Sequence, residues 1–257
     1  MFLIAKLNIF LLLNKFLHYF CKQRQSLSTM QIIKNIFTAI LRTLFPRRCI
    51  FCFGILRENE DSICNNCRNL YPFPQDCNIK DFFAPLYPYI SGICIMGTYS
   101  YCKKAILDFK GKENFRYGNC LCSLLCDKLQ NQTWINDIDI IVPVPLHKKR
   151  LAERGFNQSQ VIAQVIAKQF GKPVVSNNLY RTKYSLPQHK LPAFKRYENT
   201  QNIFQTKDAS AFEDKTVLLV DDVITTCATV AQCCKALFKS QGIKIYVCAL
   251  ASERNLF

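Results

Sequence analysis

Two adjacent carboxylates and a run of threonines are the residues best suited to chemistry in this chain of 257 residues. Asp221 and Asp222 follow a short apolar run, and Thr225, Thr226 and Thr229 come just after them. Free backbone N–H groups and hydroxyls at the start of a helix favour a phosphate. Adjacent acids beside such a loop suit the diol of a ribose, a bound magnesium ion, or both. This short segment could therefore hold a sugar phosphate.

The residues on either side predict a strand and a helix that would position these groups. Residues 217–220 are apolar and branched enough for a strand buried on both faces. A helix-like stretch covers residues 230–240, and Gly242 is placed to end it. Ligands of open α/β sheets bind just outside the carboxyl ends of the strands, which is where the two acids lie. The alternative is an ordinary buried strand that ends in an acidic turn.

The acid pair and the threonine run resemble the 5-phosphoribosyl-1-pyrophosphate (PRPP) binding signature of type I phosphoribosyltransferases. In that family the acids sit on the ribose hydroxyls and the following loop wraps the 5′-phosphate. The resemblance implies that PRPP is bound by Asp221, Asp222, Thr225, Thr226, Cys227, Ala228 (through its backbone) and Thr229. The family normally has glycine at the position of Cys227, since glycine takes φ > 0 cheaply and lets a ligand approach the backbone. A cysteine side chain there must point away or intrude, and its thiol is also a candidate nucleophile at a helix start.

A second segment combines prolines with basic residues after another apolar run. Residues 138–142 predict a buried strand, and residues 143–158 read PVPLHKKRLAERGFNQ, a basic loop. Asn157 can cap the helix predicted over residues 158–170, and Gly171 can end it. Strand, loop, helix and the strand before the acid pair form a βαβ-type series. This order predicts a mainly parallel sheet flanked by helices, with both loops facing one cleft.

This basic segment is similar to the signature of the competence protein F (ComF/GntX) family, a branch of the phosphoribosyltransferases. The later run of Arg181-Thr182-Lys183, Pro187-Gln188, Arg196 and residues 199–204 is similar to that family too. The resemblance spans about residues 42–252. It implies an α/β, phosphoribosyltransferase-like fold, preceded by a small zinc-ribbon-like module.

The family resemblance also assigns roles to the basic residues. It implies that residues 145–157 hold pyrophosphate through Arg150, Arg154, Gly155 and Asn157, and that residues 181–204 close over the site. Catalytic roles would fall to Asp221, Asp222 and Lys183. Loss of pyrophosphate leaves an oxocarbenium-like sugar and a highly charged leaving group, so fixed cations and Mg²⁺ would lower the barrier. The alternative is that the basic side chains are solvated surface or grip nucleic-acid phosphates.

Four cysteines near the start of the chain have the spacing of a metal site. Cys49-x2-Cys52 and Cys64-x2-Cys67 are separated by eleven residues, and each pair offers two thiolates from one tight turn. Four sulfurs can surround one ion tetrahedrally, so the pattern predicts structural zinc. The alternative is a pair of redox CxxC motifs or cysteines with no ligand.

The chain divides into four predicted segments. Residues 1–45 form a basic, apolar extension with a helical pattern after Met30, which is an alternative start of translation. Lysines interrupt its first 20 residues, so no apolar run there approaches the ~20 residues of a spanning helix. The other interpretation of this segment is an amphipathic basic helix that lies on a membrane surface. Residues 46–69 form the zinc module, residues 70–89 a proline-rich linker, and residues 90–257 the phosphoribosyltransferase-like domain.

Composition sets the partners and the compartment that we expect. A surplus of 34 basic over 18 acidic residues gives a net charge of +16, which attracts nucleic acid, anionic lipid or a phosphate-rich substrate. Fifteen cysteines, an odd number scattered through apolar stretches, fit a reducing cytoplasm. The family resemblance, and not the composition, implies the function: a Mg²⁺-dependent pentosyltransferase that moves phosphoribose from PRPP to an unknown acceptor and is linked to DNA uptake. The alternative implied by the same resemblance is a non-catalytic factor that handles single-stranded DNA beside a helicase, with the PRPP site as a sensor or unused.

Overall fold

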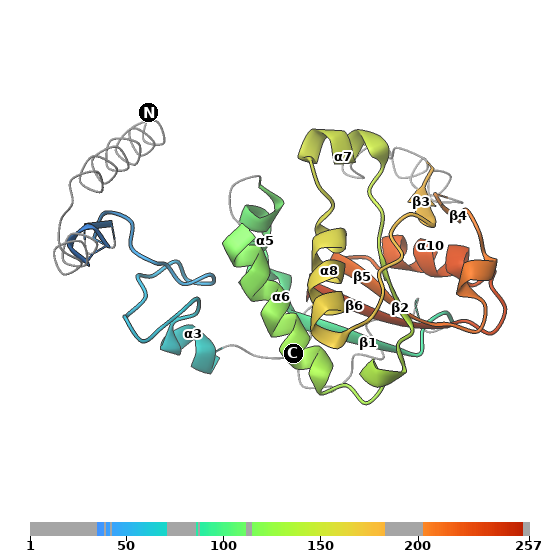
Figure 1. The fold of residues 1–257 in the computed structure, drawn as a ribbon, viewed down its shortest axis with the longest axis horizontal. Helices are drawn as coiled ribbons and strands as arrows, with labels where there is room; N and C mark the ends of the chain where they lie inside the picture. Colours follow the sequence, from blue (N-terminus) through green and yellow to red (C-terminus); the bar gives the residue numbers. More distant parts are fainter. Residues whose placement is uncertain are drawn as a thin grey trace, which may run out of the picture.

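The computed structural model describes residues 35–38, 40–41, 43–70, 86, 88–111, 115–182 and 203–253. Most of the predicted N-terminal extension, most of the predicted linker and Lys183 lie outside these residues. The larger domain is built around a central sheet with helices on both of its faces (Figure 1). Within the described ranges, no helix has both the length and the apolar character needed to cross a bilayer.

The central sheet has four strands in the order β1-β6-β5-β2. They are β1 (Gly92–Thr98), β6 (Lys244–Ser252), β5 (Thr216–Ile224) and β2 (Ile140–Pro143), and each neighbouring pair is parallel. The prediction of a mainly parallel sheet flanked by helices is therefore confirmed. Because the strands are parallel, their carboxyl ends share one edge, where Pro143 of β2 pairs with Val220 and Asp221 pairs with Ala249.

The strand before the acid pair is longer than predicted. We expected residues 217–220, but β5 continues through both acids to Ile224, which still pairs with Ser252 of β6. The prediction was wrong here because it followed side-chain polarity, whereas the ladder to β6 is made by backbone groups. Asp221 and Asp222 therefore lie inside the last part of the strand, on a rigid element.

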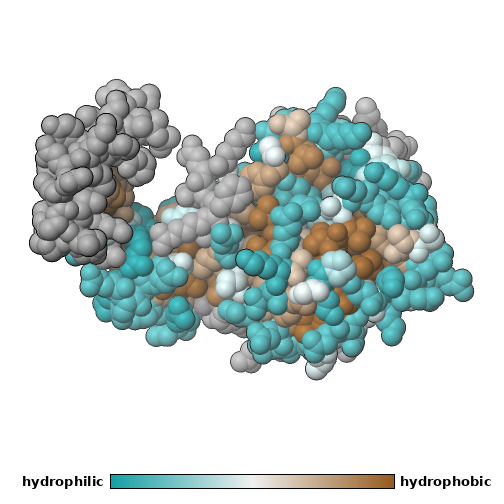
Figure 2. Space-filling view, viewed as in Figure 1, coloured by the Kyte–Doolittle hydropathy of each residue, from teal (hydrophilic) through white to brown (hydrophobic). Residues whose placement is uncertain are grey.

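Alternating side chains of the strands pack into two separate cores, as expected for a parallel sheet covered on both faces. Leu218 and Val220 face the helices α5 (Tyr99–Lys110), α6 (Phe115–Gln130) and α8 (Gln158–Phe170). Val217 and Leu219 face α10 (Ala228–Leu237) on the other side. Figure 1 shows the same layers, and Figure 2 shows hydrophilic residues over much of the outer surface.

The helix that follows the basic segment begins and ends as predicted. Asn157 precedes α8 and its side chain accepts a hydrogen bond from the backbone N–H of Ser159. Gly171 ends the helix with φ 66°, a left-handed conformation that glycine adopts easily. The helix after the acid pair was expected over residues 230–240 but runs from Ala228 to Leu237, because a left-handed residue at Cys227 sets its start.

Smaller elements complete the larger domain. A two-stranded antiparallel sheet joins β3 (Leu179–Arg181) to β4 (Phe204–Thr206), and Leu179 and Phe204 pack in the same core as α10. Two short 3₁₀ helices, η2 (Ile135–Asp137) and η4 (Ser210–Phe212), lead into β2 and β5. The pairing of β3 with β4 places Arg181 opposite Phe204.

The cysteine-rich segment packs against the outer surface of α5 and α6. It contains the short helix α3 (Asn65–Leu70), and its Ile50 and Cys67 belong to the same apolar cluster as the buried residues of α5. The rings of Phe51 and Tyr101 lie 5.0 Å apart between centroids, and the Lys104 ammonium sits 3.5 Å above the centre of the Phe53 ring. These contacts connect the segment to the larger domain.

Candidate functional site

Asp221 is held in a fixed orientation at the carboxyl end of β5. Its Oδ1 accepts a hydrogen bond from the Ser159 hydroxyl at 3.1 Å and another from the backbone N–H of Asp222 at 2.8 Å. Ser159 lies in the first turn of α8, so the capped start of that helix reaches the acid pair across the sheet edge. Among the described residues, no hydrogen bond is made to the second oxygen, Oδ2. That oxygen is the one available to a ligand.

The environment of Asp221 favours its protonated form. Asp221 is only 8% exposed, and burial, followed by the nearby charge of Asp222, raises its pKa from 3.8 to about 7. The hydrogen bonds from Asp222 and Ser159 and the charge of Lys110 act in the opposite direction but do not cancel the burial. Near neutral pH, this carboxyl can therefore either accept or donate a hydrogen bond.

Asp222 is paired with a lysine that the sequence did not single out. Its Oδ1 accepts a hydrogen bond from the backbone N–H of Val223 at 2.7 Å. Its Oδ2 lies 2.7 Å from the Nζ of Lys110, and the two side chains are only 16% and 23% exposed. Lys110 is the last residue of α5, 112 positions before its partner in the sequence, and no local pattern marks it. The ion pair places a cation directly against the acid pair.

The loop after the acids forms a small hollow at the start of α10. The hollow is shallow, is open to solvent, and is lined by Asp221, Val223, Ile224, Thr225, Cys227, Ala228, Thr229 and Val230. It thus includes most of the residues predicted to bind PRPP, with the exceptions of Asp222 and Thr226. The other five predicted residues all line the hollow.

Cys227 occupies a backbone conformation that usually belongs to glycine. Its φ is 65° and its ψ is −8°, which is left-handed, and it immediately precedes α10. The residue is 2% exposed and packs in the apolar core beneath that helix. The side chain is therefore accommodated by the core, while the backbone keeps the turn that glycine would make. A thiol buried in this way is a poor nucleophile.

The basic segment between β2 and α8 is partly helical. We expected a loop, but residues Lys148–Arg154 form the helix α7, and that part of the prediction is wrong. The His147 ring caps its first turn by accepting from the backbone N–H of Lys149 at 3.2 Å, and Gly155 ends it with φ 86°. This local capping, by a histidine rather than by one of the usual residues, is the reason that the helix was missed.

The residues predicted to hold pyrophosphate have different environments. Arg150 is exposed and pairs with Glu153 at 3.2 Å. Arg154 is partly buried and donates to Oε1 of Gln158 at 2.6 Å. Burial and the charge of Arg150 lower the pKa of Arg154, while Asp222 raises it, so Arg154 lies within electrostatic reach of the acid pair.

Asn157 is occupied by contacts within the chain. Its Nδ2 donates to the carbonyl of Val144 at 3.0 Å, and its Oδ1 accepts from the N–H of Ser159 at 3.1 Å. The neighbouring Gln158 is 1% exposed, and its Nε2 has no hydrogen-bond partner among the described residues. Asn157 thus fixes the loop against the start of α8, and Arg154 is the basic side chain of this segment that is best placed toward the acids.

The later basic run meets the site through Arg181. This residue ends β3, and its guanidinium carbon lies 5.5 Å from the centre of the Phe204 ring. Burial lowers its pKa, while the charges of Cys233 and Asp221 raise it. Arg181 is therefore close enough to Asp221 to interact with its charge. Lys183, predicted to be catalytic, lies outside the described residues.

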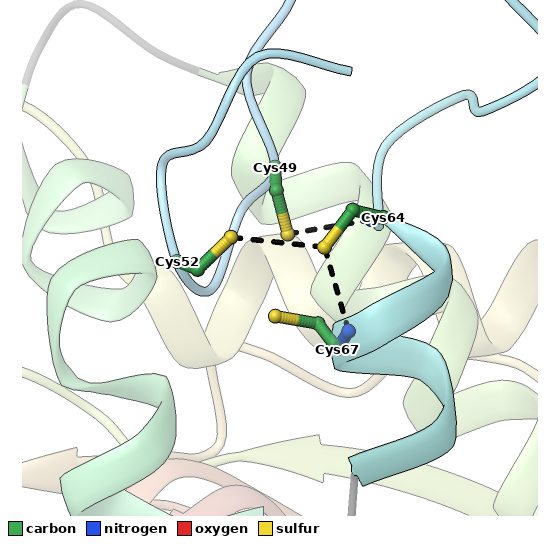
Figure 3. A group of neighbouring side chains, drawn as sticks. All are labelled: Cys49, Cys52, Cys64 and Cys67. Atoms are coloured by element: carbon green, nitrogen blue, oxygen red, sulfur yellow. Dashed lines mark hydrogen bonds between the residues drawn. The ribbon is translucent and has the colours of Figure 1, made fainter. Parts of the chain in front are cut away.

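The four predicted metal ligands lie together. The sulfurs of Cys49, Cys52, Cys64 and Cys67 are all within 4.8 Å of one another and point inward (Figure 3). Zinc bound at about 2.3 Å to each thiolate of a tetrahedron separates the sulfurs by nearly 4 Å, so the donor set fits a metal ion such as zinc.

Backbone N–H groups support the sulfurs of this cluster, as they do around metal thiolates. The N–H groups of Cys64, Gly54 and Cys67 lie 3.4 Å from the sulfurs of Cys49, Cys52 and Cys64, respectively. Burial by itself would raise the pKa of the Cys49 thiol. Hydrogen bonds from backbone N–H groups have the larger combined effect, and the pKa is lowered from 9.0 to about 7. The carboxylate of Glu60 accepts from the N–H groups of Arg57 and Asn65, both at 2.7 Å, and so ties the segment between the two cysteine pairs to the second CxxC turn.

Comparison with known proteins finds a relative that matches most of the chain. Competence protein F of Haemophilus influenzae is 27% identical over 230 residues, which are 82% of this chain and 99% of that protein. The chain is therefore similar to competence protein F along almost the full length of that protein. No family model matches the chain.

Two further relatives match shorter stretches of the chain. The DNA utilization protein YhgH of Escherichia coli K12 is 33% identical over 112 residues, 44% of this chain and 48% of that protein. Competence protein ComFC of Bacillus subtilis is 35% identical over 91 residues, 35% of this chain and 34% of that protein. The chain thus spans about half of the first of these relatives and a third of the second.

Solved structures of phosphoribosyltransferases also match part of the fold. A purine phosphoribosyltransferase from Pyrococcus horikoshii is 17% identical and covers 52% of this chain and 72% of its own, with a TM-score of 0.34. An adenine phosphoribosyltransferase from Leishmania tarentolae is 15% identical and covers 55% and 73%, with a TM-score of 0.36. At these scores the two matches say nothing of the function of this chain.

Proposed function

We propose that this protein binds PRPP at the carboxyl edge of the sheet. The observation that carries the proposal is the open hollow that Asp221, the left-handed turn at Cys227 and the start of α10 line together. Thr225, Thr229 and the N–H groups at the start of α10 suit a 5′-phosphate, because a helix start presents free donors and a positive partial charge. Oδ2 of Asp221 and Oδ2 of Asp222 suit the ribose hydroxyls, because each can accept a hydrogen bond.

The diphosphate of PRPP would lie toward the basic side of the same edge. Arg154 and Arg181 both interact electrostatically with the acid pair and are partly buried, so they would meet the diphosphate without a large loss of hydration. Lys183 remains a catalytic prediction from the family resemblance. Arg150, which is exposed and paired with Glu153, would contribute less.

The reaction that these groups suit is transfer of phosphoribose to a nitrogen acceptor. The bond from ribose C1 to the diphosphate oxygen breaks with both electrons leaving on the diphosphate, while a nitrogen lone pair forms the new bond to C1. The acceptor then loses a proton. Fixed cations near the diphosphate would stabilise its developing charge, which is the largest electrostatic demand of the step.

Isothermal titration with PRPP and Mg²⁺ tests the proposal. Wild-type protein should release heat at micromolar to millimolar ligand, and Asp221→Asn and Asp222→Asn should weaken binding by about tenfold or more, because each removes an acceptor. Asp127→Asn makes the same charge change on the exposed face of α6 and should have no effect. Full affinity in both acid variants would rule out this site.

We propose that the four-cysteine cluster holds structural zinc. The sulfur positions fit a tetrahedral ion, and the cluster lies against α5, whose Tyr101 hydroxyl hydrogen-bonds Cys67. A bound ion would therefore stabilise both the segment and its contact with the larger domain.

A second candidate function is handling of single-stranded DNA, as the names of the relatives suggest. Two of them are named for competence and one for DNA utilization, and the net charge of +16 favours a polyanion. In this proposal the protein works in the cytoplasm beside a DNA-uptake helicase. Binding to a labelled oligonucleotide should weaken steeply as salt rises from 50 to about 200 mM, by roughly 10³-fold if about six phosphates are contacted. A flat salt dependence would remove DNA phosphates as the target.

A further inference from the structure

Lys110 is the residue closest to the acid pair for which neither the sequence nor the comparisons suggest a role. Its ammonium lies 2.7 Å from Oδ2 of Asp222, and both side chains are largely shielded from water. The helix that carries it is anchored, because Ala105, Ile106 and Phe109 of α5 are buried against the sheet. Lys110 therefore approaches Asp222 from a fixed element.

Three of the four carboxyl oxygens of the acid pair already have partners among the described residues, and Oδ2 of Asp221 is the exception. Oδ1 of Asp221 already accepts two hydrogen bonds, Oδ1 of Asp222 accepts one, and Oδ2 of Asp222 faces Lys110. Mg²⁺ requires near-octahedral oxygen ligands at about 2.0–2.1 Å and is favoured by full negative charge. The Lys110 ammonium stands beside the oxygen that such an ion would use and repels it. The acids as they are arranged do not fit a directly bound magnesium ion.

Neutral hydroxyl groups fit the same arrangement well. A carboxylate oxygen has two lone pairs, so Oδ2 of Asp222 can accept from a hydroxyl while it also faces the ammonium. Oδ2 of Asp221 accepts no bond from the described residues. A vicinal diol could donate one hydrogen bond to each of these oxygens and bring no positive charge toward Lys110.

We propose that Lys110 is a built-in counter-ion that excludes divalent cations from the Asp221–Asp222 pair and reserves these acids for the hydroxyls of a sugar. The sugar part of this inference rests on the proposed PRPP function, whereas the exclusion of cations does not. Any Mg²⁺ used by the protein then arrives bound to the diphosphate. Lys110 is a positioning residue in this scheme, because it orients Asp222.

Manganese titration in the absence of any sugar phosphate tests the exclusion directly. Free Mn²⁺ is measured by electron paramagnetic resonance with the full chain loaded with zinc at pH 8, so that the cysteines are occupied. Wild-type protein should show no site tighter than millimolar that depends on Asp222. Lys110→Met should bind Mn²⁺ about tenfold or more tightly, since one charge at this distance shifts a carboxylate equilibrium by at least that factor.

Matched variants separate this effect from a general change in charge. Lys103→Met removes an exposed lysine from the same helix and should leave Mn²⁺ binding unchanged. Lys110→Arg keeps the cation and should retain the exclusion, and Lys110→Met combined with Asp222→Asn should lose the new site.

Two results would overturn the inference. One is a submillimolar Mn²⁺ site in the wild-type protein that Asp222→Asn abolishes, a measurement that needs no lysine variant to fold. The other is a folded Lys110→Met protein with wild-type Mn²⁺ affinity. The PRPP titration is independent: wild-type protein that binds no PRPP, with a Lys110→Met variant that gains Mn²⁺, would refute the proposed function and leave the exclusion standing.

Discussion

Replacing Asp221 with asparagine should stabilise the protein, and by more at pH 8 than at pH 5. The reason is the burial that raises the pKa of Asp221 from 3.8 to about 7. Between these two values the folded protein keeps a proton that the unfolded chain has lost, so stability falls as pH rises through this window. Above pH 7 the folded protein carries the buried charge, and the full cost is present.

The size of the effect follows from the pKa. Each tenfold change in proton affinity corresponds to about 1.4 kcal/mol, so the cost of Asp221 is roughly 4 kcal/mol at pH 8 and roughly 2 kcal/mol at pH 5. Asparagine keeps the side-chain shape and has no charge. The effect of the substitution on hydrogen bonds is the same at pH 5 and at pH 8, so it cancels when the two are compared. The gain in the free energy of unfolding should therefore be about 2–3 kcal/mol larger at pH 8 than at pH 5.

Urea unfolding of zinc-loaded wild-type and variant protein at the two pH values measures this difference. The exposed Asp127→Asn variant serves as the control and should show the same small difference from wild type at both. A stability gain for Asp221→Asn that is the same at pH 5 and pH 8, or larger at pH 5, would refute the reasoning. Asp221 would then be ionised in the folded protein throughout this range.

Three further predictions concern the zinc, the basic segment and the turn. Cys64→Ser removes one of the four zinc ligands, so it should lower both the zinc content, from about one ion per chain, and the melting temperature. Mass spectrometry of the metal measures the zinc content, and an unchanged content would contradict the prediction. Arg154→Met should weaken PRPP binding by about tenfold to a hundredfold in calorimetry, whereas the exposed Arg150→Met should change it by less than about threefold. Equal losses would show that burial does not separate the two arginines. Cys227→Gly should change the free energy of unfolding by no more than about 1 kcal/mol, because relief of a left-handed residue offsets the loss of buried surface. A loss above roughly 2 kcal/mol in urea unfolding would mean that the thiol is needed for packing.

Features of the fold that depend on neighbouring residues were predictable from the sequence. Asn157 and Gly171 mark the ends of α8 because capping and left-handed turns are decided within a few residues. The parallel sheet followed from the alternation of apolar runs and helical stretches. The cysteine spacing likewise indicated the cluster, because two tight turns can present four sulfurs together.

Contacts between distant parts of the chain were not predictable. Ser159 donates to Asp221 from 62 residues away, and Lys110 pairs with Asp222 from the far end of another helix. Neither residue has a neighbour that marks it, and each resembles an ordinary helical residue in the sequence. The sheet order brings them to the acids, and that order is a property of the whole fold.

The cost of Asp221 bears on why an acid lies there at all. The four residues before it in β5 are apolar and fully buried, so an apolar residue would suit the strand. Burial of this carboxyl costs the fold roughly 4 kcal/mol above pH 7. That cost is a large fraction of the free energy of unfolding of a typical protein, which is about 5–15 kcal/mol. Its neighbours orient it with two hydrogen bonds to Oδ1, and Oδ2 accepts none from the described residues. A ligand hydroxyl at that oxygen would supply the missing partner, so the unfavourable burial favours a binding role for Asp221 over a structural one.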